Sequence, residues 1–149
     1  MSQEETIVVR RAASVATIEL NDPPYNRLSM ALIDALEKTV DEIDHDEKVR
    51  AVILRGAGDT NFSVGADIRE FGAAAADRGV QSFIEQRLRV IRSIETMSKP
   101  VVCAIRGACL GGGLEIALAC HSGSARAAQR SACPRSSSAW CPRGEGRSA

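Results

Sequence analysis

Two glycine-containing turns hold the residues of this sequence that are best suited to bind a small ligand. They are residues 63–67 (SVGAD) and 111–115 (GGGLE). Each follows an apolar segment and leads toward a helical pattern, where backbone N–H groups are unpaired and lie at the positive end of a helix dipole. Two such turns brought together would offer two N–H donors to one oxygen, which is the geometry of an oxyanion hole. Glycine suits such a site because a side chain would keep the ligand away from the backbone.

Each turn also has an interpretation that needs no ligand. Residues 63–67 can be read as an ordinary loop in which Asp67 caps the following helix. The three glycines can be read as a flexible connector, although apolar segments flank them where polar residues would be expected. A carboxylate in the first turn of a helix compensates the dipole, so Glu115 is favourable there without any catalytic role.

Other chemistries find less support in the sequence. Residues 56–58 (GAG) follow an apolar run, but position 61 is Asn61, so a GxGxxG nucleotide motif is not completed. The motifs GxxxxGK[ST] and GxSxG are both absent. The five cysteines form no CxxC pair and the sequence has two histidines, so no metal site is expected. Cys103 and Cys109 lie in an apolar stretch, and we expect them to be buried, reduced thiols.

The strands that must position these turns are predicted from hydrophobic periodicity. Short apolar or alternating runs predict strands at residues 6–10, 15–20, 51–55 and 101–105. These strands alternate with helical patterns in the order β-β-α-β-α-β-α. Apolar strands alternating with amphipathic helices predict an α/β fold, with a mostly parallel sheet flanked by helices.

Three helices are expected between and after these strands. Ser29 has the residue type of an N-cap, and the helix after it carries an apolar face made of Ile33, Leu36, Val40 and Ile43. A second helix is expected over residues 80–97, with an apolar face made of Phe83, Ile84, Leu88, Ile91 and Ile94. A third helix is expected over residues 114–120.

Length and charge set further bounds. The chain has 149 residues, which corresponds to about one domain. It carries 19 Lys and Arg against 19 Asp and Glu, so a formal net charge of zero gives no argument for a nucleic acid or an acidic membrane as partner. No apolar run reaches the ~18 residues of a membrane span, and the first residues lack the layout of a signal peptide. A soluble, cytoplasmic protein is therefore expected.

The composition changes abruptly at residue 121. Residues 121–149 contain seven Ser, six Ala, five Arg and one Glu, but no Val, Ile, Leu, Met or Phe. Such a segment cannot bury enough apolar surface to offset the entropy lost on ordering. We therefore assign residues 1–120 to an incomplete globular core and residues 121–149 to a disordered tail.

Two segments of the sequence resemble the crotonase family, which includes enoyl-CoA hydratases and isomerases. Residues 62–71 (FSVGADIREF) match the family's pattern G-A-D-[IL]-[KR]-E. Residues 98–120 (SKPVVCAIRGACLGGGLEIALAC) match its pattern around the glycine-rich turn. Residues 18–29 (IELNDPPYNRLS) look like the family's N-terminal substrate loop, although Arg27 stands where a small residue is usual. The resemblance covers about residues 6–120 and implies a spiral of ββα units.

The resemblance also implies roles for individual residues. In this family two backbone N–H groups polarise a thioester carbonyl, and the matching donors here are Ala66 and Gly112, whose nitrogens we expect within about 6 Å of each other. Glu115 matches the first of two catalytic glutamates and would activate water. Substrate would also be lined by Asp67, Ile68 and Arg69. The family needs no metal or redox cofactor, because coenzyme A is part of its acyl-CoA substrate, and its members are homotrimers or hexamers.

The sequence departs from the family at residue 121. The family continues with a G-L-P-E segment that supplies the second glutamate, whereas the matching position here is Arg135. Residues 131–142 (SACPRSSSAWCP) can be encoded by a nucleotide sequence, chosen among synonymous codons, that has a second meaning. When the reading frame of that sequence starts two bases later, it encodes G-L-P-E-V-K-L-G-L-V-P, which is the family's continuation. We therefore interpret residues 121–149 as frame-shifted, with a genuine basic tail as the alternative.

The resemblance predicts a lyase of the enoyl-CoA hydratase type. Such an enzyme adds water across the 2,3-double bond of an acyl-CoA thioester through an enolate held in the oxyanion hole, as in fatty acid β-oxidation. The alternatives are a double-bond isomerase of the same family and a catalytically inactive acyl-CoA-binding or interaction module. Because the tail replaces the second glutamate and apolar segments that should cover the core, we expect weak activity and aggregation.

Overall fold

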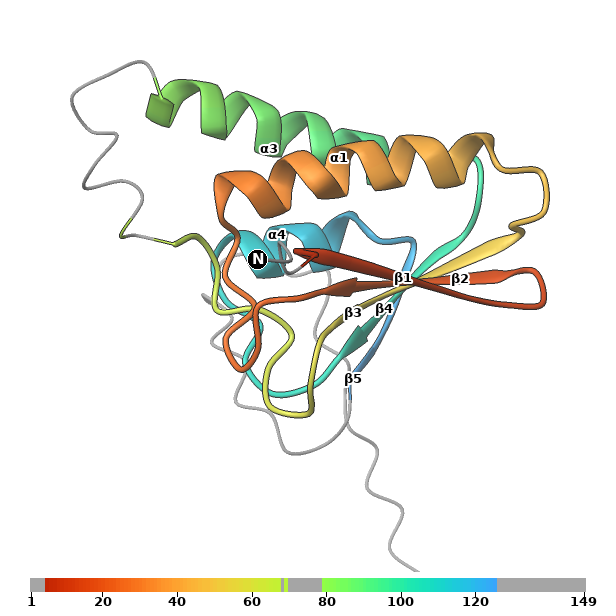
Figure 1. Ribbon diagram of the computed structural model, residues 1–149, viewed down its shortest axis with the longest axis horizontal. Coiled ribbons are helices and arrows are strands. Elements are labelled where there is room, and N and C mark those ends of the chain that lie inside the picture. The colour runs from red at the N-terminus through yellow and green to blue at the C-terminus, as the bar shows by residue number, and fades with distance from the viewer. Residues whose placement is uncertain (1–4, 68, 70–78, 126–149) are drawn as a thin grey trace, which may run out of the picture.

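The structure, a computed structural model, describes residues 5–67, 69 and 79–125. The described chain forms five strands and three helices (Figure 1). The strands are β1 (Ile7–Ala12), β2 (Val15–Leu20), β3 (Ala51–Gly56), β4 (Val101–Ile105) and β5 (Ser122–Ala125). The helices are α1 (Met30–His45), α3 (Gly79–Glu95) and α4 (Gly112–Ala119).

The strands form one sheet in the order β1-β2-β3-β4-β5. β1 and β2 pair antiparallel, and the other three pairings are parallel. The register places Ile18 beside Leu54, and Leu54 beside Cys103, so one apolar row crosses three strands. The expected α/β fold with a mostly parallel sheet is confirmed.

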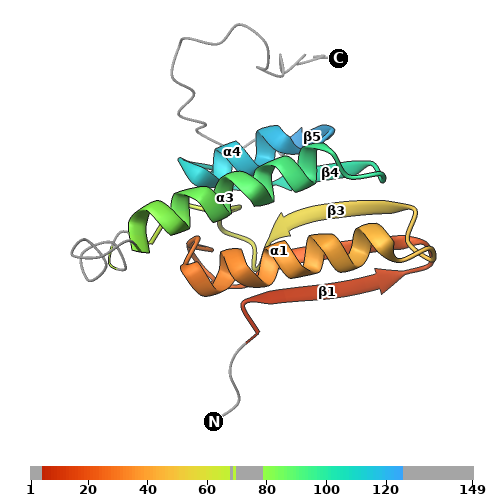
Figure 2. The ribbon, with the colours of Figure 1, turned by 90° about the horizontal axis from the view of Figure 1, so that it is seen from above.

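The helices cover one face of this sheet. Figures 1 and 2 show α1 and α3 lying side by side along that face, with α4 close to β4 and β5. The buried strand residues Ile18, Leu54 and Cys103 form the core with the inward side chains of the helices. On the opposite face, Thr17 and Ile53 remain half-buried.

Helix α1 agrees with the sequence in both its beginning and its apolar face. The Ser29 side chain caps it by accepting a hydrogen bond from the Leu32 N–H at 3.1 Å. The four residues predicted to face inward are all buried, namely Ile33, Leu36, Val40 and Ile43. Leu32 is buried as well. The predicted N-cap and helical face are therefore confirmed.

The predicted apolar face of α3 is partly wrong. Phe83 and Ile94 are buried as expected, but Ile84 is 40% exposed and Leu88 is 54% exposed. The inward stripe continues instead through Val90. The helix is rotated relative to the prediction, because both stripes fit a 3.6-residue period and only packing against α1 and α4 selects one of them.

Strand β5 was not predicted from the sequence. It lies beyond residue 120, the last residue that we assigned to the core, and pairs parallel with β4 from Val102↔Ser122 to Ile105↔Ala125. A strand of Ser, Gly and Ala is possible here because a ladder of backbone hydrogen bonds needs no apolar side chain. Residues 126–149 of the predicted tail lie outside the described residues.

Helix α4 begins two residues earlier than predicted. Gly112 and Gly113, which we assigned to the turn, are its first two residues, and Gly111 is the N-cap. Cys103 and Cys109 are buried free thiols, as expected. Burial raises the pKa of Cys109 to about 11, so this thiol stays protonated at neutral pH. In the part of the chain that the structure describes, no helix is long and apolar enough to span a membrane.

Candidate active site

In the part of the chain that the structure describes, one unit occurs three times, and the candidate site lies where these units contact each other. Each unit has a main strand, a short extended segment and a helix, and the extended segments contain Leu28, residues 63–66 and Cys109. These segments are joined by isolated parallel bridges, Leu28↔Ala66 and Ser63↔Cys109. The second bridge brings the first glycine turn beside Cys109, two residues before the second turn.

The two glycine turns are in direct contact. A β-carbon placed on Gly65 would lie 3.0 Å from the Leu110 carbonyl oxygen and 3.5 Å from the Gly112 nitrogen. Gly65 also has a φ of 95°, which side chains rarely adopt. A β-carbon on Gly113 would meet the Ser63 side chain at 2.7 Å. Glycine at both positions is therefore what lets the backbones approach each other.

The backbone amides of Ala66 and Gly112 are not used by the local hydrogen bonds. Leu28 N–H donates to the Gly65 carbonyl at 2.9 Å, and Asp67 N–H donates to the Leu28 carbonyl at 3.3 Å. The Ala66 N–H is therefore not a donor in the bridge between Leu28 and Ala66. Among the described residues, neither Ala66 N–H nor Gly112 N–H donates to a backbone acceptor outside regular elements. Each of the two adjacent turns thus has one N–H that no backbone oxygen of residues 5–67, 69 and 79–125 accepts outside regular elements.

Glu115 lies in the first turn of α4, and its side chain is 49% exposed. Its Oε2 lies 3.4 Å from Nη2 of Arg87, which reaches across from α3. The Arg87 side chain is 21% exposed, and its Nε is buried without a hydrogen-bond partner among the described residues. Sequence reasoning missed Arg87, because the expected face of the helix included Ile84 and Leu88, and only the packing shows that the inward stripe runs through Val90 instead.

Asp67 is part of a charged cluster beside Ala66. Its carboxylate accepts from the Arg69 guanidinium at 2.6 Å and 2.9 Å and lies 3.9 Å from Nε of Arg27. The hydrogen bond from Arg69 lowers the pKa of Asp67 to about 2. Arg27 also pairs with Asp22 at 2.7 Å. Asp67 and Arg69 are therefore paired beside Ala66, their expected contact with substrate stays a prediction, and Ile68 lies outside the described residues.

The loop before α1 is held by Asn26 against the segment that precedes the first glycine turn, and by Tyr25 against the turn itself. The buried Asn26 side-chain amide donates to the Ala57 carbonyl at 3.0 Å and to the Asn61 carbonyl at 2.8 Å. Val64 N–H donates to the Tyr25 carbonyl at 3.0 Å. Asn26 thus orders the loop that resembles a substrate loop, a structural role that the sequence analysis did not assign.

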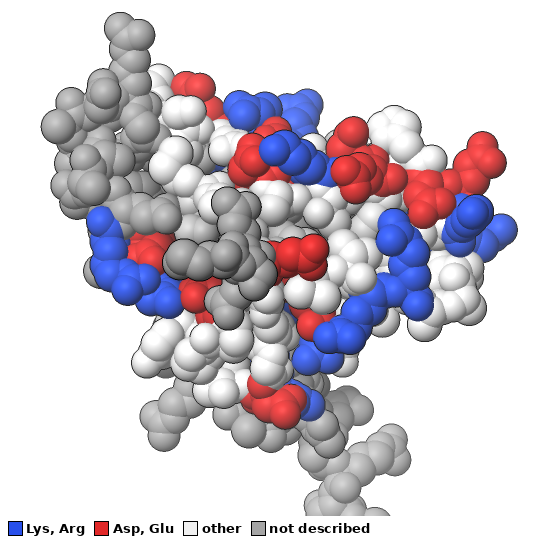
Figure 3. Space-filling model, in the orientation of Figure 1, with Lys and Arg blue, Asp and Glu red and all other residues white. Residues whose placement is uncertain are grey.

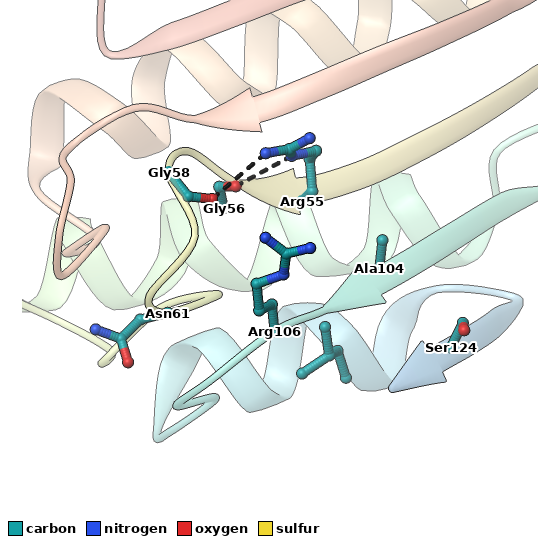
Figure 4. A pocket seen from close by; sticks show the side chains of 8 residues that line it. Arg55, Gly56, Gly58, Asn61, Ala104, Arg106 and Ser124 are labelled. Atoms are coloured by element: carbon teal, nitrogen blue, oxygen red, sulfur yellow. Dashed lines mark hydrogen bonds between the residues drawn. The ribbon is translucent and has the colours of Figure 1, made fainter. Parts of the chain in front are cut away.

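A cavity of about 210 Å³ opens at the carboxyl ends of β3 and β4 (Figure 4). Its lining includes the side chains of Arg55, Asn61 and Arg106, but it does not include Ala66, Gly112 or Glu115. Both arginines have partners, since Arg55 donates to backbone carbonyls and Arg106 pairs with Asp59. This cavity is therefore separate from the contact between the glycine turns.

The remaining described surface offers little other chemistry. Basic and acidic side chains are interspersed on the face shown in Figure 3. Across residues 5–67, 69 and 79–125, no group of three or more His, Cys, Asp or Glu side chains is arranged to hold a metal ion. The contact between the two turns, with Glu115 beside it, is the arrangement best suited to polarise a carbonyl oxygen and move a proton.

Comparison with known proteins identifies the family of this chain. Residues 10–132 match the model of the family described as Enoyl-CoA hydratase/isomerase. A probable enoyl-CoA hydratase of Bacillus subtilis (strain 168) is 39% identical over 107 residues, which make up 72% of this chain and 41% of that protein. A short-chain-enoyl-CoA hydratase of Clostridium acetobutylicum is 36% identical over 115 residues, or 76% of this chain and 44% of that protein.

A solved structure shares the fold as well. The enoyl-CoA hydratase/carnithine racemase of Magnetospirillum magneticum superposes with a TM-score of 0.81 at 30% identity, covering 87% of this chain and 49% of that one. The fold is thus the crotonase fold, a spiral of ββα units. The chain belongs to the enoyl-CoA hydratase/isomerase family. It spans less than half the length of each of these three proteins.

Proposed function

We propose that the two glycine turns and Glu115 form the first half of an enoyl-CoA hydratase site, whose substrate is an acyl-CoA thioester with a 2,3-double bond. The observation that carries the proposal is the contact between the turns, where a β-carbon on Gly65 would lie 3.5 Å from the Gly112 nitrogen, and it supports the pairing of the Ala66 and Gly112 amides that we propose. Membership of the enoyl-CoA hydratase/isomerase family and the hydratase names of two relatives support it.

The proposed reaction uses these groups in two ways. The Ala66 and Gly112 amides donate hydrogen bonds to the thioester oxygen, which withdraws electron density from C3 of the enoyl group. The Glu115 carboxylate accepts a proton from water as the water oxygen bonds to C3, and the π electrons move onto the thioester oxygen as an enolate. The protonated Glu115 then gives this proton to C2 and the carbonyl re-forms, so that one water has been added and Glu115 is again a carboxylate. Donors already in place stabilise the enolate without reorganisation.

In this proposal the charged cluster around Asp67 binds the coenzyme A part of the substrate. Arg69 and Arg27 lie beside Ala66, where they flank the Asp67 carboxylate. Guanidinium groups bind phosphate through paired hydrogen bonds, so the two arginines suit the phosphates of the coenzyme. No metal or redox cofactor takes part in the proposed reaction.

An enoyl-CoA isomerase is the second candidate. Helix α4 brings a single carboxylate, Glu115, to Gly112. One carboxylate suffices to remove a proton from C2 of a 3-enoyl thioester and return it to C4, whereas hydration in this family uses two. We also propose that segment 121–149, with Arg135 where the family has its second glutamate, leaves this chain a poor hydratase.

The test compares the 149-residue chain with a chimera in which residues 121–149 are replaced by the aligned and following part of the Bacillus subtilis relative. Each protein is assayed with 2-enoyl-CoA for hydration and with 3-enoyl-CoA for isomerisation. Binding of a saturated acyl-CoA is measured by calorimetry. Greater hydration by the chimera supports the proposal, and isomerisation alone favours the second candidate. Binding without either reaction indicates an inactive binding module, and no binding by either protein contradicts the site.

A further inference from the structure

Helix α3 carries an arginine at a position of its inward stripe where its neighbours are apolar. Phe83, Val90 and Ile94 on this stripe are buried, and residue 87 lies four residues after the first and three before the second. The Arg87 Nε is buried and has no hydrogen-bond partner among the described residues. A buried unpaired donor opposes folding, so packing alone does not account for an arginine here.

The contacts of Arg87 connect it to both candidate catalytic positions on α4. Its Nη2 lies 3.4 Å from Oε2 of Glu115. A β-carbon on Gly112 would lie 3.5 Å from Nη1 and 3.6 Å from Cδ of the same side chain. The guanidinium therefore packs over the backbone of Gly112 and reaches Glu115 from that position.

We propose that Arg87 is a positioning residue that holds the Glu115 carboxylate beside the Gly112 amide. The inference rests on the proposed hydratase site and adds to it a residue from another helix. Glu115 is about half exposed, and an unrestrained glutamate side chain occupies several rotamers. The Arg87 guanidinium, itself anchored between α3 and Gly112, restricts the carboxylate to one side of the turn.

This role separates stability from catalysis. Because Nε of Arg87 is buried without a partner, an apolar side chain of similar length should pack at least as well. The same change should release Glu115, and displacement of a catalytic group by ~1 Å can cost up to ~10²-fold in rate. If Arg87 served only to stabilise the fold, its replacement would lower stability and leave the rate unchanged.

The experiment measures hydration of a 2-enoyl-CoA and urea unfolding for the 149-residue chain and three variants. Arg87→Met should lower kcat ~10-fold or more, leave KM within ~2-fold and leave the unfolding midpoint unchanged or higher. Arg87→Lys should retain part of the activity, since an ammonium keeps the charge but not the planar geometry. Arg89→Met is the matched control, because Arg89 pairs with the distant Glu37 at 3.0 Å.

A double variant tests whether Arg87 acts through Glu115. In a Glu115→Gln background, Arg87→Met should change kcat less than ~2-fold, because there is no carboxylate left to position. Equal kcat values for Arg87→Met and Arg89→Met, in a chain that hydrates substrate, overturn the inference and leave the proposed function standing. So does a full Arg87→Met effect in the Glu115→Gln background.

Failure of the proposed function gives a different result. In that case the unchanged chain hydrates no enoyl-CoA, and the side-chain carboxyl 13C resonance of Glu115 becomes the readout. A shift of this resonance in Arg87→Met, absent from Arg89→Met, supports the Arg87–Glu115 contact independently of activity. The same resonance in both variants overturns the inference.

Discussion

Helices α1 and α3 lie side by side on the same sheet, but their inward faces differ in kind (Figure 2). The inward face of α1 is wholly apolar, from Leu32 to Ile43. The inward stripe of α3 is interrupted by Arg87, which contacts Glu115 at the start of α4. The two amphipathic helices therefore have different roles. Helix α1 packs against the sheet, and α3 also brings a charged side chain to the candidate site.

The difference shows why an amphipathic pattern alone is a poor guide to function. On α1 the apolar face read from the sequence is the buried face. On α3 the sequence suggested a face that includes Ile84 and Leu88, and both of these side chains are exposed. A charged side chain on a helix is usually solvated, so an inward-facing arginine is visible only after packing has selected the stripe.

The largest expected effect comes from the packing helix. Leu36→Ala on α1 removes a side chain with 0% exposure and should lower the free energy of unfolding by ~2–5 kcal/mol. Leu88→Ala on α3, where the side chain is 54% exposed, should stay within ~0.5 kcal/mol. Urea denaturation of both variants checks the difference, and similar losses would mean that the two helices pack alike.

The next effect concerns the residue that α3 contacts. In a full-length chain with the family's continuation restored after residue 120, Glu115→Gln should lower hydration at least ~100-fold while leaving binding of a saturated acyl-CoA largely intact, since general acid–base catalysis contributes ~10²–10⁴. Glu42→Gln on the exposed side of α1 is the control and should leave turnover unchanged. An unaltered turnover in Glu115→Gln would make Glu115 a dipole-compensating charge only.

A smaller effect is expected where the glycine turns meet. Gly65→Ala combines a φ of 95° with a contact of 3.0 Å to the Leu110 carbonyl oxygen, so it should cost ~1–3 kcal/mol and reduce hydration. Gly58 also has a positive φ, 73°, and it lies outside the site. A β-carbon at this position would come no closer than 3.6 Å to another atom, the Cβ of Pro23, so Gly58→Ala is a suitable control. It should lower stability without a specific loss of activity, and a similar loss of activity in both variants would contradict the assignment.

The smallest effect is on the pH dependence of stability near Asp67. The hydrogen bond from Arg69 lowers the Asp67 pKa from 3.8 to about 2 in the folded chain. A carboxyl group with a lowered folded-state pKa contributes stability above its unfolded pKa and loses that contribution as the pH falls toward the folded value. In Asp67→Asn the free energy of unfolding should therefore fall less steeply between about pH 4 and pH 2 than it does in the unchanged chain. An unchanged slope would show that the pairing with Arg69 does not stabilise the fold.

Local patterns in the sequence determined much of this molecule. The strands at residues 15–20 and 51–55, the cap at Ser29 and the buried face of α1 each depend on residues close together in the chain. The two glycine turns were found in the same way, because short-range conformational needs select glycine. The pairing of their amides in one oxyanion hole, and the catalytic role of Glu115, remain predictions.

Only the tertiary structure decided which surfaces meet. Strand β5 forms from Ser, Gly and Ala because β4 offers an edge for backbone pairing, which no side-chain pattern encodes. The rotation of α3, and with it the inward place of Arg87, is set by packing against α1 and α4. The bridge between Leu28 and Ala66 joins residues 38 positions apart in the chain. Such contacts depend on the summed packing of distant elements, so the composition of any single segment does not specify them.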